Sequence, residues 1–115
     1  MRELTVGKNL TAGSANLVYK VPKGCKAIAT LLMLSNYGGS SKSITSSWYD
    51  HSTNTSVTIV GGHSISAGSY LMFDQGGRMV MDEYDELRVT PESGSSFSVI
   101  FTVEIHQNTA YQNGS

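Results

Sequence analysis

Charged residues are scarce in this chain. Asp, Glu, Lys and Arg make up 15% of its 115 residues, against about 25% in an average soluble domain. The formal net charge is -1, so the sequence has no basic excess with which to replace the counterions of a phosphate backbone. This composition argues against a dedicated nucleic-acid binder. Gly, Ser and Thr take the place of the missing charges, which is typical of all-β proteins with short strands.

Cysteine and long apolar runs are also lacking. One cysteine, Cys25, excludes an internal disulfide and fits a reducing cytosol. The longest apolar stretch, residues 27–34, is interrupted by Thr30 and is far shorter than the roughly 20 residues of a spanning helix. The first ten residues lack the apolar core of a signal peptide. We therefore expect no membrane association and a chain that folds where it is made.

What the sequence has is strand periodicity. In residues 96–106, Phe97, Phe101 and Ile105 share one face with Val99 and Val103, and Ile100 alone breaks the apolar-polar alternation of a half-buried strand. Residues 25–36 are apolar on both faces, as in a central strand that is covered on two sides. Continuing the alternation through this strand would place Cys25, Ala27, Ala29, Leu31 and Met33 on one face.

Shorter strands are predicted elsewhere, with a turn signal about every ten residues. The predicted strands are 2–8, 16–21, 43–49, 56–60, 69–73, 78–81 and 86–90, and the turns include Gly61-Gly62 and Gln75-Gly76-Gly77. This pattern predicts an all-β fold, an antiparallel β-sandwich of jelly-roll-like form. Residues 1–9 would be an N-terminal arm or edge strand, 10–107 the sandwich domain and 108–115 a flexible C-terminal tail.

The candidate chemical groups favour no enzyme. Residues 82–86 carry four carboxylates, which could bind a hard cation such as calcium, but the spacing favours a solvated turn in which Asp85 caps the following strand. His51, His63 and His106 lack the clustered spacing of a zinc site. Cys25 stands between Lys23 and Lys26, and such neighbours can activate a thiol, yet its place at the start of an apolar strand favours a buried, structural role. We expect no cofactor and no metal.

The turns and strands together resemble a known group of proteins. The matching segments are Tyr19-Lys20-Val21-Pro22-Lys23-Gly24, residues 32–36, Ile65-Ser66-Ala67-Gly68, Asp85-Glu86-Leu87-Arg88-Val89 and residues 98–105. This succession resembles the small β-sandwich structural proteins of tailed bacteriophages, which include capsid decoration (cement) proteins and tail or fibre modules. The resemblance covers residues 16–106. The acidic segment Asp82-Glu83-Tyr84 and the cysteine after Gly24 depart from it.

The resemblance implies a non-enzymatic virion protein. It would be made in the host bacterial cytoplasm, form a homo-oligomer, with a trimer favoured, and bind the major capsid protein on the outer surface of the phage head. The second apolar face of residues 25–36 could then be part of an interface. The expected capsid or subunit contacts are Arg2, Glu3, Leu4, Val6, Tyr37, Trp48 and Tyr49.

Two other functions stay open. The chain could be a tail, baseplate or fibre component of the same kind of particle. It could instead be a carbohydrate-binding adhesin, in which Trp48, Tyr49 and Tyr37 on neighbouring loops stack on sugars.

Overall fold

Nine β-strands and no helix make up the described part of the chain. A computed structural model describes residues 2–74 and 79–108. The strands are β1 (Arg2–Asn9), β2 (Asn16–Lys20), β3 (Cys25–Asn36), β4 (Lys42–Asp50), β5 (Thr55–Ile65), β6 (Tyr70–Phe73), β7 (Met79–Met81), β8 (Glu86–Pro91) and β9 (Phe97–Gln107). Each predicted strand has its counterpart here. The predicted turn at 75–77, Arg78 and residues 109–115 lie outside the described residues.

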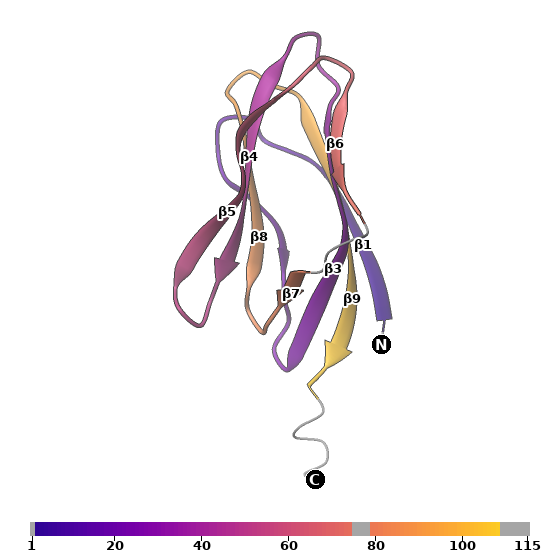
Figure 1. The fold of residues 1–115 in the computed structure, drawn as a ribbon, viewed down its shortest axis with the longest axis vertical. Helices are drawn as coiled ribbons and strands as arrows, with labels where there is room; N and C mark the ends of the chain where they lie inside the picture. The colour runs from indigo at the N-terminus through magenta and orange to yellow at the C-terminus, as the bar shows by residue number, and fades with distance from the viewer. Residues whose placement is uncertain (1, 75–78, 109–115) are drawn as a thin grey trace.

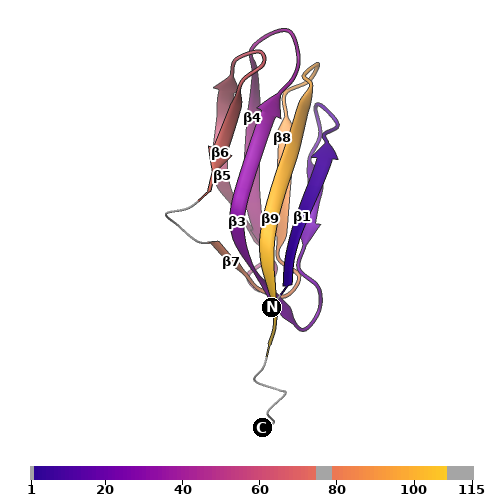
Figure 2. The same cartoon turned by 90° about the vertical axis from the view of Figure 1, so that its right-hand side faces the viewer.

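The strands form two antiparallel sheets packed face to face (Figures 1 and 2). One sheet has the order β1-β9-β3-β6, with β7 also paired to β3, and the other has the order β2-β8-β4-β5. Because β6 and β7 both pair with β3, they act as one interrupted edge strand. With β6 and β7 counted as one, the eight strands are divided between the sheets in the order of a jelly roll, in which only β4 and β5 follow one another within one sheet. The predicted fold class is confirmed.

The pairing of β3 with β9 is the longest ladder, with eleven residue pairs. It carries a β-bulge between Ala29 and Leu31, at Thr30. A bulge adds one residue to one strand, so every later side chain changes face. Leu32 and Leu34 therefore point into the sandwich, opposite Phe101 and Val99. The expectation that Leu31 and Met33 share a face with Cys25 is wrong for this reason: both point outward.

The core lies between the sheets and follows the alternation of β9. Phe97, Val99, Phe101 and Val103 are all at most 1% exposed, and the ring of Tyr19 packs on Phe101 at 6.1 Å between centroids. Cys25 at the start of β3 contacts this core cluster but is only half-buried, which is less than the buried position that the sequence predicted.

Gly61-Gly62 is not the turn that was predicted. β5 continues through both glycines to Ile65, and the register against β4 shifts on either side of Ser46. Gly62 has φ +58°, a conformation that glycine adopts without a steric penalty, and its N–H donates to Thr45 Oγ1 at 2.9 Å. The pair therefore forms an irregularity within a long edge strand.

Tyr19 gives a test of the core. Its hydroxyl is buried with no hydrogen-bond partner among the described residues, and the pKa of Tyr19 is raised above 10.0, first by burial and then by the nearby Cys25, against an opposing effect of Arg2. We expect Tyr19→Phe to raise the free energy of unfolding at pH 7 by about 1 kcal/mol, because it removes an unsatisfied polar group.

The same variant should change the pH dependence of stability. Above the unfolded-state pKa of Tyr19, the unfolded chain loses a proton that the folded chain keeps, so stability falls as pH rises. Urea unfolding between pH 7 and 11 should show a shallower fall for Tyr19→Phe than for the unchanged chain. Parallel curves would show that Tyr19 titrates alike in both states.

Candidate interaction surface

Six apolar side chains lie on the outer face of the β1-β9-β3-β6 sheet, the face turned away from the other sheet. We call them the outer patch. They are Ile28, Leu31, Met33, Met72, Val80 and Ile100. Met72, Val80 and Ile100 are 43%, 48% and 36% exposed. Such a cluster is unusual because the solvent-facing side of an antiparallel sheet is ordinarily polar.

The outer patch is continuous across the strands. Met33 of β3 lies opposite Ile100 of β9 on one side and Met72 of β6 on the other. Ile28, further along β3, lies opposite Val80 of β7. Ile28 is buried, yet it is not a member of the core cluster, because its neighbours on the outer face cover it. Directly opposite cross-strand side chains touch, so these residues form one surface.

Polar residues border the outer patch. Thr5 and Thr102 share a hydrogen bond between their hydroxyls at 2.8 Å. Glu104 lies opposite Glu3 in the ladder, and its Oε1 is 3.5 Å from His106 Nε2. At the other end of the sheet the border is uncharged, with Ser35 opposite Ser98. An apolar centre with a polar border is the usual anatomy of a protein interaction site.

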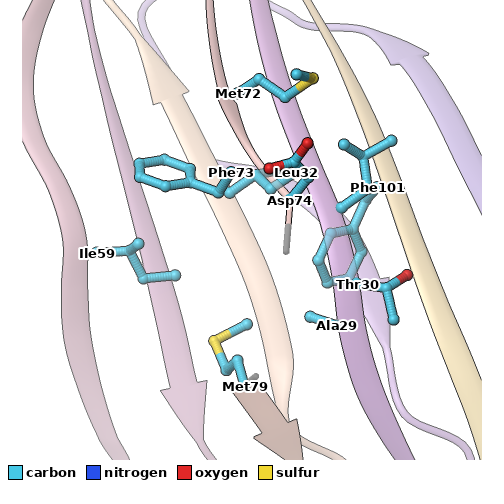
Figure 3. Close-up of a pocket in the computed structure, with 10 residues that line it drawn as sticks. Ala29, Thr30, Leu32, Ile59, Met72, Phe73, Asp74, Met79 and Phe101 are labelled. Carbon is cyan, nitrogen blue, oxygen red and sulfur yellow. The ribbon is translucent and has the colours of Figure 1, made fainter. Parts of the chain in front are cut away.

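A cavity of about 420 Å³ opens at the sandwich edge between β5 and the interrupted strand β6–β7. Ile59 approaches it from β5, and Phe73 and Met79 approach it from β6 and β7 (Figure 3). Leu32 and Phe101 close it on the core side. Asp74 is its only charged lining residue among those that the structure describes. The cavity suits apolar groups and holds no arrangement of polar groups typical of catalysis.

The acidic run, residues 82–86, is hydrogen-bonded to other parts of the chain. Asp85 is 1% exposed, and its carboxylate accepts hydrogen bonds from the indole N–H of Trp48 at 3.1 Å and from the backbone N–H groups of His51 at 3.0 Å and Asp82 at 2.9 Å. Glu83 accepts the N–H of Gly24 at 2.7 Å. The run is therefore a corner that ties itself to two other segments, residues 48–51 and the turn at Gly24, and Asp85 is buried where the sequence indicated a solvated turn.

This corner holds one residue in an uncommon backbone conformation. Tyr84 has φ +68°, which is unfavourable for a bulky side chain. Its N–H donates to Val21 O at 2.9 Å, and its ring lies 5.2 Å from that of His51, edge to face. These contacts, together with the bonds of Asp85, hold the turn in place.

No metal site is found in residues 2–74 and 79–108, where no group of three or more His, Cys, Asp or Glu side chains could hold an ion. The structure also has, over the same residues, no helix that is long and apolar enough to cross a membrane.

The N-terminal contact residues fall on both faces of an edge strand. Residues 2–9 form β1, paired along its length with β9. Leu4 and Val6 pack against the core cluster, while Arg2 and Glu3 are exposed. The apolar members of this set therefore stabilise the sandwich itself, because β1 is paired within its own chain.

The three aromatic residues proposed to stack on sugars are not brought together. Tyr37 follows β3 and is 58% exposed, whereas Trp48 and Tyr49 lie near the far end of β4. The Trp48 ring packs on the core. Tyr49 stacks under the guanidinium of Arg88 at 4.3 Å from the ring centroid, and its hydroxyl bonds to Asn54.

The sequence held one signal of the outer patch. Ile100 was the single residue that broke the alternation of its strand, and it lies at the β1 side of the patch, between Met33 and Gly7. Met72 and Val80 gave no such signal, because they fall in short strands whose faces cannot be assigned without the pairing to β3.

These features define an antiparallel jelly-roll sandwich with an apolar outer face. No protein-family description matches the chain, and no curated protein matches its sequence. Among solved structures it is similar to a chain of the Bacillus endospore appendages, described as a novel family of disulfide-linked pili, with a TM-score of 0.55 and 16% identity over 92% of this chain and 85% of that one. At this identity the likeness shows the fold alone.

Asp85→Asn tests the corner. All three partners of the carboxylate donate hydrogen bonds, and an amide offers one acceptor oxygen and two donors in its place. We expect Asp85→Asn to lower the free energy of unfolding by about 3 kcal/mol, because buried donors lose their acceptor. Asp82→Asn, at an exposed neighbouring side chain, should change it by less than about 0.5 kcal/mol. Equal effects in urea unfolding would show that the three bonds contribute little.

Proposed function

We propose that this protein is a non-enzymatic structural subunit that docks onto a larger protein assembly through the outer patch. The observation that carries the proposal is the continuous apolar row from Ile100 through Met33 to Met72 on a sheet face that would otherwise be polar. Docking there would be favoured, because removing apolar surface from water contributes about 25 cal/mol per Å². The fold supports the same role, since a chain of similar fold belongs to a pilus-like appendage.

The partner that we propose is the major capsid protein of a tailed bacteriophage. In this proposal the chain decorates the outer surface of the head, where copies favour a trimeric arrangement and stabilise the capsid lattice. The support is the resemblance of residues 16–106 to small phage sandwich proteins, together with a docking face on the sheet. Glu3, exposed on the neighbouring strand opposite Glu104, would contribute a polar contact at the border of that face, whereas Arg2 lies on the other side of this strand, opposite Ile105.

A subunit of a tail, a fibre or another appendage is the second candidate. The fold likeness to the endospore appendage chain favours it. Copy number separates the two candidates, because a head lattice takes hundreds of copies and a tail takes a handful. The adhesin has less support, since Trp48 Nε1 is bonded to Asp85 and Tyr37 lies at the other end of the sandwich.

Ile100→Lys tests the docking face. A lysine at position 100, at one end of the apolar row, would place an unpaired charge inside the interface, which is strongly unfavourable. We expect at least about a 100-fold loss of affinity, equivalent to about 2.7 kcal/mol, for undecorated heads of the phage that encodes the chain. Co-sedimentation of purified chain with those heads measures it.

The matched control is Leu17→Lys. Leu17 is 46% exposed on β2 of the other sheet, so this variant adds the same charge at a comparable exposure on the opposite side. It should bind as the unchanged chain does. Circular dichroism and urea unfolding establish that both variants fold. Normal binding of Ile100→Lys, or equal loss in both variants, would count against the outer patch.

A further inference from the structure

β5 differs from the other edge strands of the two sheets. β1 carries Arg2, Glu3 and Lys8. β2 has five residues and a bulge, and β6 and β7 have four and three residues. Charges, bulges and short length are the usual protections of a sheet edge against pairing with another chain. β5 has eleven residues with no Lys, Arg, Asp, Glu or Pro. Within the described residues it pairs with β4 alone, in regular register over residues 55–58 and with register shifts only beyond them.

The apolar side chains of β5 face a gap in the sandwich. Val57 lies opposite Trp48, whose ring contacts the core, so Val57 points toward the other sheet. Ile59 also points inward and lines the 420 Å³ cavity with Phe73 and Met79 (Figure 3). Val57 and Ile59 nevertheless remain 45% and 37% exposed, because the sandwich is open along this edge.

We infer that two copies of this chain pair through β5, antiparallel and about a two-fold axis at Val57. The two β2-β8-β4-β5 sheets then form one continuous sheet of eight strands. The side chains of Val57 and Thr55 of the second copy extend the inner layer past the free edge. Val57 then covers Val57 of the first copy, and Thr55 covers Ile59 at the mouth of the cavity.

The faces of β5 select this register. In an antiparallel pair, residues directly opposite one another lie on the same face. A two-fold axis at Val57 places Val57 opposite Val57 of the second copy, Ser56 opposite Thr58, and Thr55 opposite Ile59. In each of these pairs, both side chains point to the same face of the sheet. An axis at Thr58 would instead place Ser56 opposite Val60. These two side chains point to different faces, because Ser56 points outward and Val60, which is 8% exposed, points inward.

The occupant is a second copy because the edge is complementary to itself. A two-fold contact uses the same patch on both subunits, so any charge near the axis would meet its like. The segment 55–60 has none. The other edges of the two sheets carry Arg2, Glu3, Lys8 or Lys20, or are too short to offer a comparable row of backbone groups.

Disulfide trapping tests the register. In a Cys25→Ser background, Val57→Cys places two thiols opposite one another across the axis, at the Cα separation of about 4.5–5.5 Å that a disulfide spans. We expect at least tenfold more covalent dimer than for Leu17→Cys, which has a matched exposure of 46% against 45%. Thr58→Cys, one residue from the axis and on the other face, should also fail to cross-link with itself.

Sedimentation velocity tests the pairing without new thiols. The unchanged chain should show a concentration-dependent dimer, and Val57→Lys, which sets two like charges at the axis, should raise the dimer dissociation constant at least 100-fold. Leu17→Lys should leave it unchanged. Ile100→Lys should dimerise normally, so failure of the outer patch and failure of the β5 pairing are distinguished.

Three results would overturn the inference. The unchanged chain could stay monomeric up to about 1 mM, a weak-binding limit. Val57→Cys and Leu17→Cys could cross-link equally. Open assemblies larger than a dimer could form through β5, which would contradict a closed two-fold contact.

Discussion

The antiparallel pairing of β3 with β9 is the constraint on which the rest of the structure depends. Its eleven pairs join the middle strands of one sheet and place Leu32, Leu34 and Phe101 in the core. Because side chains alternate along a strand, the same ladder necessarily sets Met33 beside Ile100 on the outside. The bulge at Thr30 places Leu32 and Leu34 inside in place of Leu31 and Met33, which it turns outward. The core and the outer patch therefore arise from one pairing.

This sandwich has two candidate surfaces for contact with other proteins, one on a sheet face and one at a sheet edge. The outer patch lies on one sheet, and the uncharged edge of β5 belongs to the other sheet. A docking face and a pairing edge on different sheets can be occupied at once, so a subunit can be held on a scaffold and joined to a neighbour. The low content of charged side chains, 15% of the chain, fits a protein whose surfaces are covered by other proteins. Asp85, buried at the corner, ties Trp48, His51 and Asp82 together with three hydrogen bonds, and Trp48 is the residue opposite Val57 of β5.

Local patterns in the sequence were enough to predict the strands and the fold class. Period-two alternation and glycine or proline turns act over a few residues, and the sandwich follows from them. The bulge at Thr30 could not be foreseen, because its residue type is ordinary and the extra residue shows only against β9. The burial of Asp85 depends on Trp48, 37 residues away, and Leu4 and Val6 turn inward only because β1 pairs with β9. For the candidate site, Ile100 was visible as an anomaly, while Met72 and Val80 join it only through their pairing to β3.

We propose that this chain is a structural subunit held through the outer face of the β1-β9-β3-β6 sheet. Electron cryo-microscopy of the particle that carries the chain tests it most directly, because it gives both the position and the number of copies. We expect many ordered copies with Met33, Met72 and Ile100 buried against the supporting protein. An image in which these three side chains face solvent would contradict it, whatever else the particle shows.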